Sequence, residues 1–168
     1  MAAIPEHIDI ARIPTGTEAT LGMQLAHERL FAEFAPDNPP VIRNLQAFLD
    51  NDNAALIVAI SGNTPESPGG WQNLPSERYL GTLILFFTQT LTQDLAILPH
   101  VAVSGEHQSQ GIGTALVRKA LEECGLRGVS RLELTSGPSK PKAHAMYRRL
   151  GFYTHDTINW RYTFDEPI

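Results

Sequence analysis

The sequence has 168 residues, of which 42% are hydrophobic and 18% charged, an ordinary balance for a single globular domain over residues 1–168. Its formal net charge of −5 disfavours nucleic-acid binding and docking on acidic membranes, because both usually require a basic surface. The single cysteine, Cys124, and the lack of a signal-like or membrane-spanning apolar segment predict a cytoplasmic protein without internal disulfides.

The first third of the chain is expected to form a strand, two helices and a second strand. Residues Ile8 to Ile13 alternate apolar and polar side chains, which is typical of a strand at a sheet edge. Apolar residues then recur at helical spacing from about Glu18 to Phe34 and from about Val41 to Asp50, with a proline-rich break between them. Ala54 to Ile60 is an apolar run of strand length.

The next segment, Ser61 to Glu77, is rich in Gly, Pro, Asn and Ser and predicts a long loop. A loop of this length inside a compact domain is uncommon. Trp71 lies within it. The favoured interpretation is a solvent-facing loop held by one aromatic side chain, and the alternative is a lid over a substrate.

The second half of the chain predicts five strands and two helices. The strands are expected at Arg78–Gln89, Leu95–Val103, Arg131–Leu134, Phe152–His155 and Asn159–Phe164. The helices are expected at Gly111–Leu126, with Cys124 on its buried face, and at Lys142–Leu150, which Gly151 closes. The three consecutive strands in the middle of the chain should be antiparallel, whereas the strand–helix–strand unit from Leu95 to Leu134 should be parallel. This order predicts an α/β (α+β) fold with a mixed sheet.

The segment from Gln108 to Gly113 carries the clearest local motif. Neither the GxxxxGK pattern of a P-loop nor the dinucleotide pattern GxGxxG occurs, because Leu116 stands where the third glycine would be. Gln108, Gly111 and Gly113 do satisfy a third pattern, Q/RxxGxG/A. At a helix start, unpaired N–H groups and the helix dipole favour phosphate oxygens. Taken alone, the segment fits either a phosphate-binding loop or an ordinary turn that uses glycines.

A second motif, AHAMYRRLGF, occupies Ala143 to Phe152. The two motifs together resemble the GNAT superfamily of acyl-CoA-dependent N-acyltransferases, whose second segment reads AHxFYxxxGF. Met146 stands in place of the usual phenylalanine. The resemblance covers nearly the whole chain and is strongest from about Gly81 to Phe152. It implies a central mixed sheet flanked by helices, in which two parallel strands splay apart and hold the cofactor.

The resemblance also implies the residues of the cofactor site. The pantetheine arm of acetyl-CoA would pair with the backbone of Val101, Ala102 and Val103. The pyrophosphate would meet the backbone of Gln108, Ser109, Gln110, Gly111, Ile112, Gly113 and Thr114. Tyr147 matches the family's proton donor to the leaving thiolate and would contact the cofactor, and a phenol of pKa about 10 suits that step. The alternative for Tyr147 is a core tyrosine whose hydroxyl is satisfied.

Two positions depart from the family pattern. Related sequences often carry an acidic residue followed by Asn or Asp before this strand, and here Pro99 and His100 stand there. His100 is therefore the candidate base, since an unperturbed histidine has a pKa of about 6.5, with a structural histidine as the alternative. His144 is a weaker candidate. Lys140 replaces a common asparagine, so that contact to the cofactor is lost or Lys140 reaches a phosphate.

The function implied by the resemblance is an acetyl-CoA-dependent N-acetyltransferase that acts on a primary amine of a small molecule or peptide, by direct transfer in a ternary complex. A non-catalytic acyl-CoA-binding sensor and a protein lysine acetyltransferase are the alternatives. No metal is expected, because the six histidines and one cysteine lack ligand spacing. A homodimer is compatible with the sequence. The first two helices would wall the substrate site, which makes Phe31 and Phe34 candidates for substrate contact or for the core.

Overall fold

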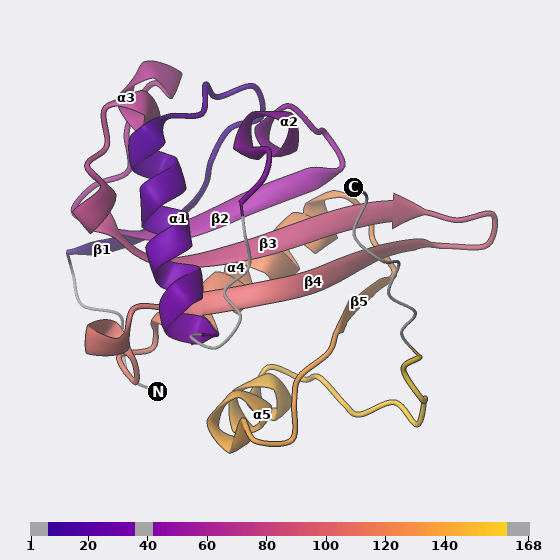
Figure 1. Cartoon of the computed structure of the whole chain (residues 1–168). Helices are drawn as coiled ribbons and strands as arrows, with labels where there is room; N and C mark the ends of the chain where they lie inside the picture. The colour runs from indigo at the N-terminus through magenta and orange to yellow at the C-terminus, as the bar shows by residue number, and fades with distance from the viewer. Residues whose placement is uncertain (1–6, 36–41, 161–168) are drawn as a thin grey trace, which may run out of the picture. The chain divides into compact units, whose positions relative to one another are not determined.

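The computed structural model describes residues 7–35 and 42–160, and it contains a five-stranded sheet (Figure 1). The strands lie in the order of the chain: β1 (Ile8–Arg12), β2 (Ala54–Ser61), β3 (Tyr79–Gln89), β4 (Asp94–Val103) and β5 (Arg131–Leu134). Neighbouring strands from β1 to β4 are antiparallel, whereas β5 is parallel to β4. The predicted mixed sheet is therefore confirmed.

Residue contacts divide the chain into two compact units, Met1–Thr135 and Ser136–Ile168. The first unit holds the whole sheet and four helices: α1 (Leu21–Phe34), α2 (Leu45–Leu49), α3 (Pro68–Gln72) and α4 (Ile112–Leu126). It also holds two short 3₁₀ turns, η1 (Ser76–Arg78) and η2 (Gly105–His107). The second unit contains α5 (Pro141–Arg149). No helix in the described ranges is long and apolar enough to cross a bilayer.

Helices α1 and α2 cover one face of the sheet, which is the near face in Figure 1. Thr20 caps α1, because its Oγ1 accepts a hydrogen bond from the Met23 N–H at 3.2 Å, and the helix therefore begins later than the expected Glu18. Asn44 caps α2 in the same way through the Ala47 N–H at 3.0 Å. Their apolar residues join one core cluster with strand residues, among them Met23, Leu30, Phe31, Leu49, Leu56, Val58 and Ile60.

Helix α4 covers the other face of the sheet. Ile112, Leu116, Ala120 and Cys124 are buried on it, as the spacing predicts. Gly81 of β3 permits the close approach, since a Cβ there would lie 3.1 Å from the Leu116 side chain and 3.1 Å from the Ala102 carbonyl oxygen. The close packing of α4 on the sheet thus depends on the absence of a side chain at Gly81.

An ion pair between Glu123 and Arg12 connects α4 to the edge strand β1. Glu123 is buried, and its Oε2 lies 3.3 Å from Arg12 Nη1 on β1. Its Oε1 lies 3.6 Å from the ammonium of Lys119, one turn earlier on the helix. The Lys119 side chain is half-buried beside this carboxylate.

Two other sequence expectations need correction. The segment expected as a loop over Ser61–Glu77 contains α3 and part of η1, and Trp71 within it is buried at 2% exposure in the α1-side core. The prediction of a loop held by one aromatic side chain is thus right about Trp71 as the anchor. It is wrong about the absence of regular secondary structure. Phe152–His155 forms no strand, and neither do Asn159 and Trp160, while the rest of that expected strand lies outside the described residues.

Candidate functional site

The parallel pairing of β4 with β5 stops halfway along β4. It runs from Leu95 opposite Arg131 to Leu98 opposite Leu134, whereas β4 itself continues to Val103. Pro99 follows the last paired residue and has no N–H to donate. The pairing with β5 does not extend to Val101, Ala102 and Val103 among the residues described. This edge is a strand backbone that can pair with an extended ligand.

The antiparallel pairing of β3 with β4 changes register at the same point. Ile84 pairs with His100 and Phe86 with Ile97, so two steps along β3 correspond to three along β4. Such a β-bulge bends the strand, re-aims side chains and is common beside active sites. Beyond the bulge, Leu56, Ile84 and His100 form one cross-strand row on the α1 side.

The loop after β4 combines left-handed backbone with an uncapped helix start. Ser109 has φ of 64° and Gly111 has φ of 88°. Glycine adopts this region freely, whereas serine is strained there by about 1–3 kcal/mol. Gly111 is the N-cap of α4, and no side chain caps the helix. The N–H groups of its first turn, Ile112 to Thr114, have no partner within the helix and suit an external anion.

The side chains of the two glutamines in this loop donate hydrogen bonds to nearby backbone carbonyls. Gln108 Nε2 donates to the Val103 carbonyl at 3.4 Å, and Gln110 Nε2 donates to the Glu106 carbonyl at 3.3 Å. These hydrogen bonds therefore stabilise the loop conformation. The backbone N–H groups, and not the glutamine side chains, are the candidates for contact with an anion. The first unit thus brings together the predicted residues from His100 to Thr114.

The predicted residues Lys140, His144 and Tyr147 belong to the second unit. The Tyr147 ring meets Phe152 edge-on, with ring centroids 5.6 Å apart. Burial raises the pKa of Tyr147 above its ordinary value, so the phenol stays protonated at neutral pH. His144 Nε2 lies 3.2 Å from Ser136 Oγ, which fits a structural role. Lys140 is the N-cap residue of α5, and burial lowers its pKa.

A cavity of about 210 Å³ lies between α1, α2 and the sheet. Its floor is the row Leu56, Ile84 and His100, and the His100 ring lies 5.4 Å from the ring of Phe31 on α1. Phe31 is both a core residue, at 2% exposure, and a lining residue of the cavity. Phe34, the other aromatic candidate, is 38% exposed and is not part of the lining.

Among the polar residues that line this cavity, sequence reasoning missed His27, Arg43 and Asn44. His27 lies one helical turn before Phe31, and that spacing was the signal that could have found it. Arg43 lies just before α2, and no pattern in the sequence marks it as a residue of the cavity. Within the described ranges, no group of three His, Cys, Asp or Glu side chains could hold a metal ion.

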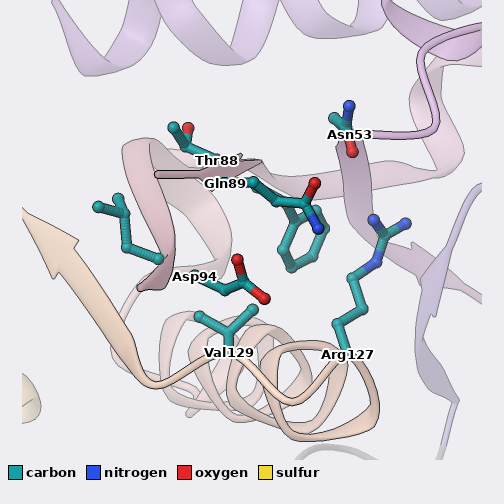
Figure 2. Close-up of a pocket in the computed structure, with 8 residues that line it drawn as sticks. Asn53, Thr88, Gln89, Asp94, Arg127 and Val129 are labelled. Carbon is teal, nitrogen blue, oxygen red and sulfur yellow. The ribbon is translucent and has the colours of Figure 1, made fainter. Parts of the chain in front are cut away.

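A second cavity, also of about 210 Å³, lies at the other end of β4 (Figure 2). Asp94, at the start of that strand, lines it, and the Arg127 guanidinium stacks over the Phe87 ring at 3.9 Å. β4 is ten residues long from this end to Val103, which corresponds to roughly 30 Å. None of the predicted site residues lines this cavity.

The sequence matches the model of a protein family described as the acetyltransferase (GNAT) family over residues 23–152. A ribosomal protein bS18-alanine N-acetyltransferase of Escherichia coli K12 is 36% identical over 83 residues, which are 45% of this chain and 56% of the relative. The match thus spans about half the length of this curated relative. A rat protein, N-acetyltransferase family 8 member 3, is 39% identical over 67 residues, covering 40% of this chain and 28% of that protein.

Solved structures share the fold over nearly the whole chain. An aminoglycoside acetyltransferase from an uncultured soil metagenomic sample, in complex with trehalose, superposes with a TM-score of 0.76 at 20% identity, covering 97% of this chain and 100% of the other. A ribosomal-protein-alanine N-acetyltransferase from Brucella melitensis biovar Abortus 2308 has a TM-score of 0.65 at 17% identity, with coverage of 94% and 99%. At these identities the likeness establishes the fold, as the sequence motifs predict.

Proposed function

This chain belongs to the acetyltransferase (GNAT) family, and from that premise we propose that it transfers the acetyl group of acetyl-CoA to a primary amine of a small molecule or peptide. The observation that carries the proposal is the continuous path from the unpaired edge of β4 to the uncapped start of α4. The edge suits the amides of an extended pantetheine arm, and the helix start suits a pyrophosphate. Direct transfer in a ternary complex is the proposed route.

The cofactor contacts of the proposal are mostly backbone contacts. Val101, Ala102 and Val103 would pair with the pantetheine arm, and the segment Gln108–Thr114 would bind the pyrophosphate. Left-handed Ser109 and Gly111 support this assignment, because strained backbone persists where a loop must present its N–H groups in one arrangement. Lys140 would contribute a charge to a phosphate, since a lysine carries a positive charge at neutral pH.

Bound acetyl-CoA would supply an activated acetyl thioester. His100 would take the proton that the amine loses as its nitrogen forms the new bond to the acetyl carbon. The carbon–sulfur bond breaks in the same transfer, and Tyr147 would donate its phenolic proton to the departing thiolate. The raised pKa of Tyr147 supports this role, because the donor must hold its proton at neutral pH. The half-buried position of His100 on the cavity floor supports its role as base.

A screen of amines with acetyl-CoA, following the release of free thiol, tests the proposal. The panel should contain small monoamines, polyamines, a peptide with an N-terminal alanine and a peptide with internal lysines. Thiol release with a monoamine or an N-terminal peptide supports the proposed function. Release with lysine peptides alone would favour a protein lysine acetyltransferase, and tight acetyl-CoA binding without release would favour a sensor.

The sensor is retained as a second candidate because of Pro99. A proline stands where relatives often carry a carboxylate, so a direct ionic base is missing at that position. His100→Ala separates the two functions. An enzyme loses turnover on this change and keeps cofactor binding, whereas a sensor has no turnover to lose. We also propose a cytoplasmic location, since a reducing compartment suits the single cysteine thiol.

A further inference from the structure

The cavity at the start of β4 is lined by polar side chains that the described protein does not engage (Figure 2). These side chains are Asn53, Thr88, Gln89, Asp94 and Arg127. Within the described part of the chain, none of the five makes a side-chain hydrogen bond or an ion pair. Their donors and acceptors are therefore available to a ligand.

Two of these side chains bring opposite charges to the cavity. An aspartate side chain is negatively charged at neutral pH, and an arginine side chain is positively charged. Figure 2 shows the Asp94 carboxylate and the Arg127 guanidinium on opposite sides of the cavity. A ligand that carries one charge of each sign would thus find a counter-charge at both of its ends.

The guanidinium of Arg127 is held in place by an aromatic ring. It stacks over Phe87, with its central carbon 3.9 Å from the ring centroid. Stacking covers one face of the planar guanidinium and leaves the N–H donors along its edge available. Those donors match the two oxygens of a carboxylate, which arginine commonly binds through two parallel hydrogen bonds. A carboxylate is therefore the ligand group that this end of the cavity suits.

Backbone hydrogen bonds hold the walls of the cavity together. The Asn53 carbonyl accepts from the Phe87 N–H at 2.8 Å, which joins the segment before β2 to β3. The Asp94 carbonyl accepts from the Ser130 N–H at 3.1 Å and from the Ser130 hydroxyl at 2.7 Å. Because these contacts use only the backbone of Asn53 and Asp94, their side chains are left for a ligand in a cavity that is already formed.

The size and the apolar part of the lining limit the ligand. Phe87, Leu95 and Val129 supply the apolar surface. A cavity of about 150 Å³ can hold benzene, so the roughly 210 Å³ here accommodates a short zwitterion with a small aliphatic group. Cavities for drug-sized ligands and cofactors are larger, about 300–1,000 Å³.

We propose that this cavity binds a free α-amino acid with a small aliphatic side chain, its carboxylate on Arg127 and its ammonium on Asp94. The site uses the start of β4 and the C-cap residue of α4, whereas the opposite ends of the same two elements form the proposed cofactor site. The inference is therefore independent of acetyl transfer and adds a second ligand to this protein.

Calorimetric titration without acetyl-CoA tests each charge separately. The ligands are L-valine, 2-methylpropylamine, which lacks the carboxylate, and 3-methylbutanoate, which lacks the amine. For the wild-type protein, loss of either group should weaken binding by at least about tenfold. Arg127→Gln should bind valine and 2-methylpropylamine about equally, because the carboxylate has lost its partner. Asp94→Asn should likewise bind valine and 3-methylbutanoate about equally.

A preference for valine that persists at wild-type size in either variant would overturn the proposal. Both substituted side chains are exposed, so little loss of stability is expected, and melting temperatures check this. Arg148→Gln is the matched control, since it removes an exposed arginine outside the cavity and should leave all three affinities unchanged.

Nuclear magnetic resonance on the unaltered protein locates the ligand. Valine should shift the side-chain amide resonances of Asn53 and Gln89 and leave the His100 ring unaffected. Shifts at His100 alone would mean that valine enters the cavity beside α1, which would overturn this inference and leave the proposed transferase in place. Failure of alanine, valine and leucine to bind at millimolar concentration would also overturn it.

Discussion

At the scale of single residues, His100 occupies the position where the bulge in β4, the cavity and the aromatic ring of Phe31 meet. In the proposed role of base, it would remove the proton that the amine loses on transfer. His100→Ala should lower turnover at pH 7 by at least about tenfold. The loss should shrink as pH rises, because the amine then deprotonates in solution. A pH–rate profile measures this, with the exposed His155→Ala as control. A profile identical to wild type would make His100 a structural residue.

Tyr147 gives a second prediction at this scale. Tyr147→Phe keeps the ring against Phe152 and removes only the hydroxyl. Turnover should fall at least about tenfold while affinity for acetyl-CoA stays nearly unchanged. Since burial raises its pKa above the ordinary value, no loss of activity from ionisation of Tyr147 is expected at neutral or mildly alkaline pH. Tyr153→Phe, at an 81% exposed position, is the matched control. Lower stability with full activity per folded molecule would indicate a packing role.

The thiol of Cys124 gives a third prediction. Burial raises its pKa to about 11, with a further rise from Glu123 that outweighs the opposing effect of Arg127. The reactive thiolate is therefore scarce at pH 8. A colorimetric thiol reagent should detect almost no thiol in the folded protein and one per chain in denaturant. Rapid labelling of the native state would contradict this, and it would also add background to the thiol-release assay.

At the scale of elements, the loop between β4 and α4 depends on Gly111 for its conformation and, in the proposed function, for ligand access. Its φ of 88° is unfavourable for any L-residue with a Cβ. Gly111→Ala should cost about 1 kcal/mol of stability and weaken acetyl-CoA binding. The matched control is Gly128→Ala just beyond the other end of α4, where φ is 66° and no neighbouring atom lies within 4 Å of the added Cβ.

The Gly128→Ala control separates the effect of backbone strain on stability from an effect on ligand binding. Both changes should lower the melting temperature by similar amounts in the absence of ligand. Only Gly111→Ala should reduce the stabilisation that acetyl-CoA produces, as measured by calorimetry. If Gly111→Ala and Gly128→Ala had equal effects on acetyl-CoA binding, the loop would not be part of the cofactor site.

At the scale of the whole molecule, the proposed acetyl-CoA site exists only in the native fold, so binding would stabilise that fold. Acetyl-CoA should raise the melting temperature, and at about 100 times its Kd the added stability is about 2.7 kcal/mol. The shift should saturate with the same Kd that direct titration gives. An unchanged melting temperature at millimolar acetyl-CoA, with folded protein, would contradict the cofactor assignment.

The sequence by itself determined the elements of the sheet and the local motifs of this protein. Periodicity records which faces of a segment are apolar, and this was enough for β2, β3, β4 and α4. Gly111 needed no tertiary information, because its left-handed backbone at the start of α4 is a local requirement. The same logic failed for Phe152–His155, since alternation indicates that a segment can pair but not that a partner strand lies beside it.

The tertiary structure alone decided the bulge at Pro99 and the make-up of the cavity. His27, Leu56, Ile84 and His100 lie in four different elements, and only helix packing and strand register bring them together. Register is a relation between strands, and a shift of one residue would move His100 to the α4 face. For the same reason, the opposite charges of Asp94 and Arg127 at one cavity have no signature in the sequence. They become visible only once the start of β4 and the end of α4 are placed in the fold.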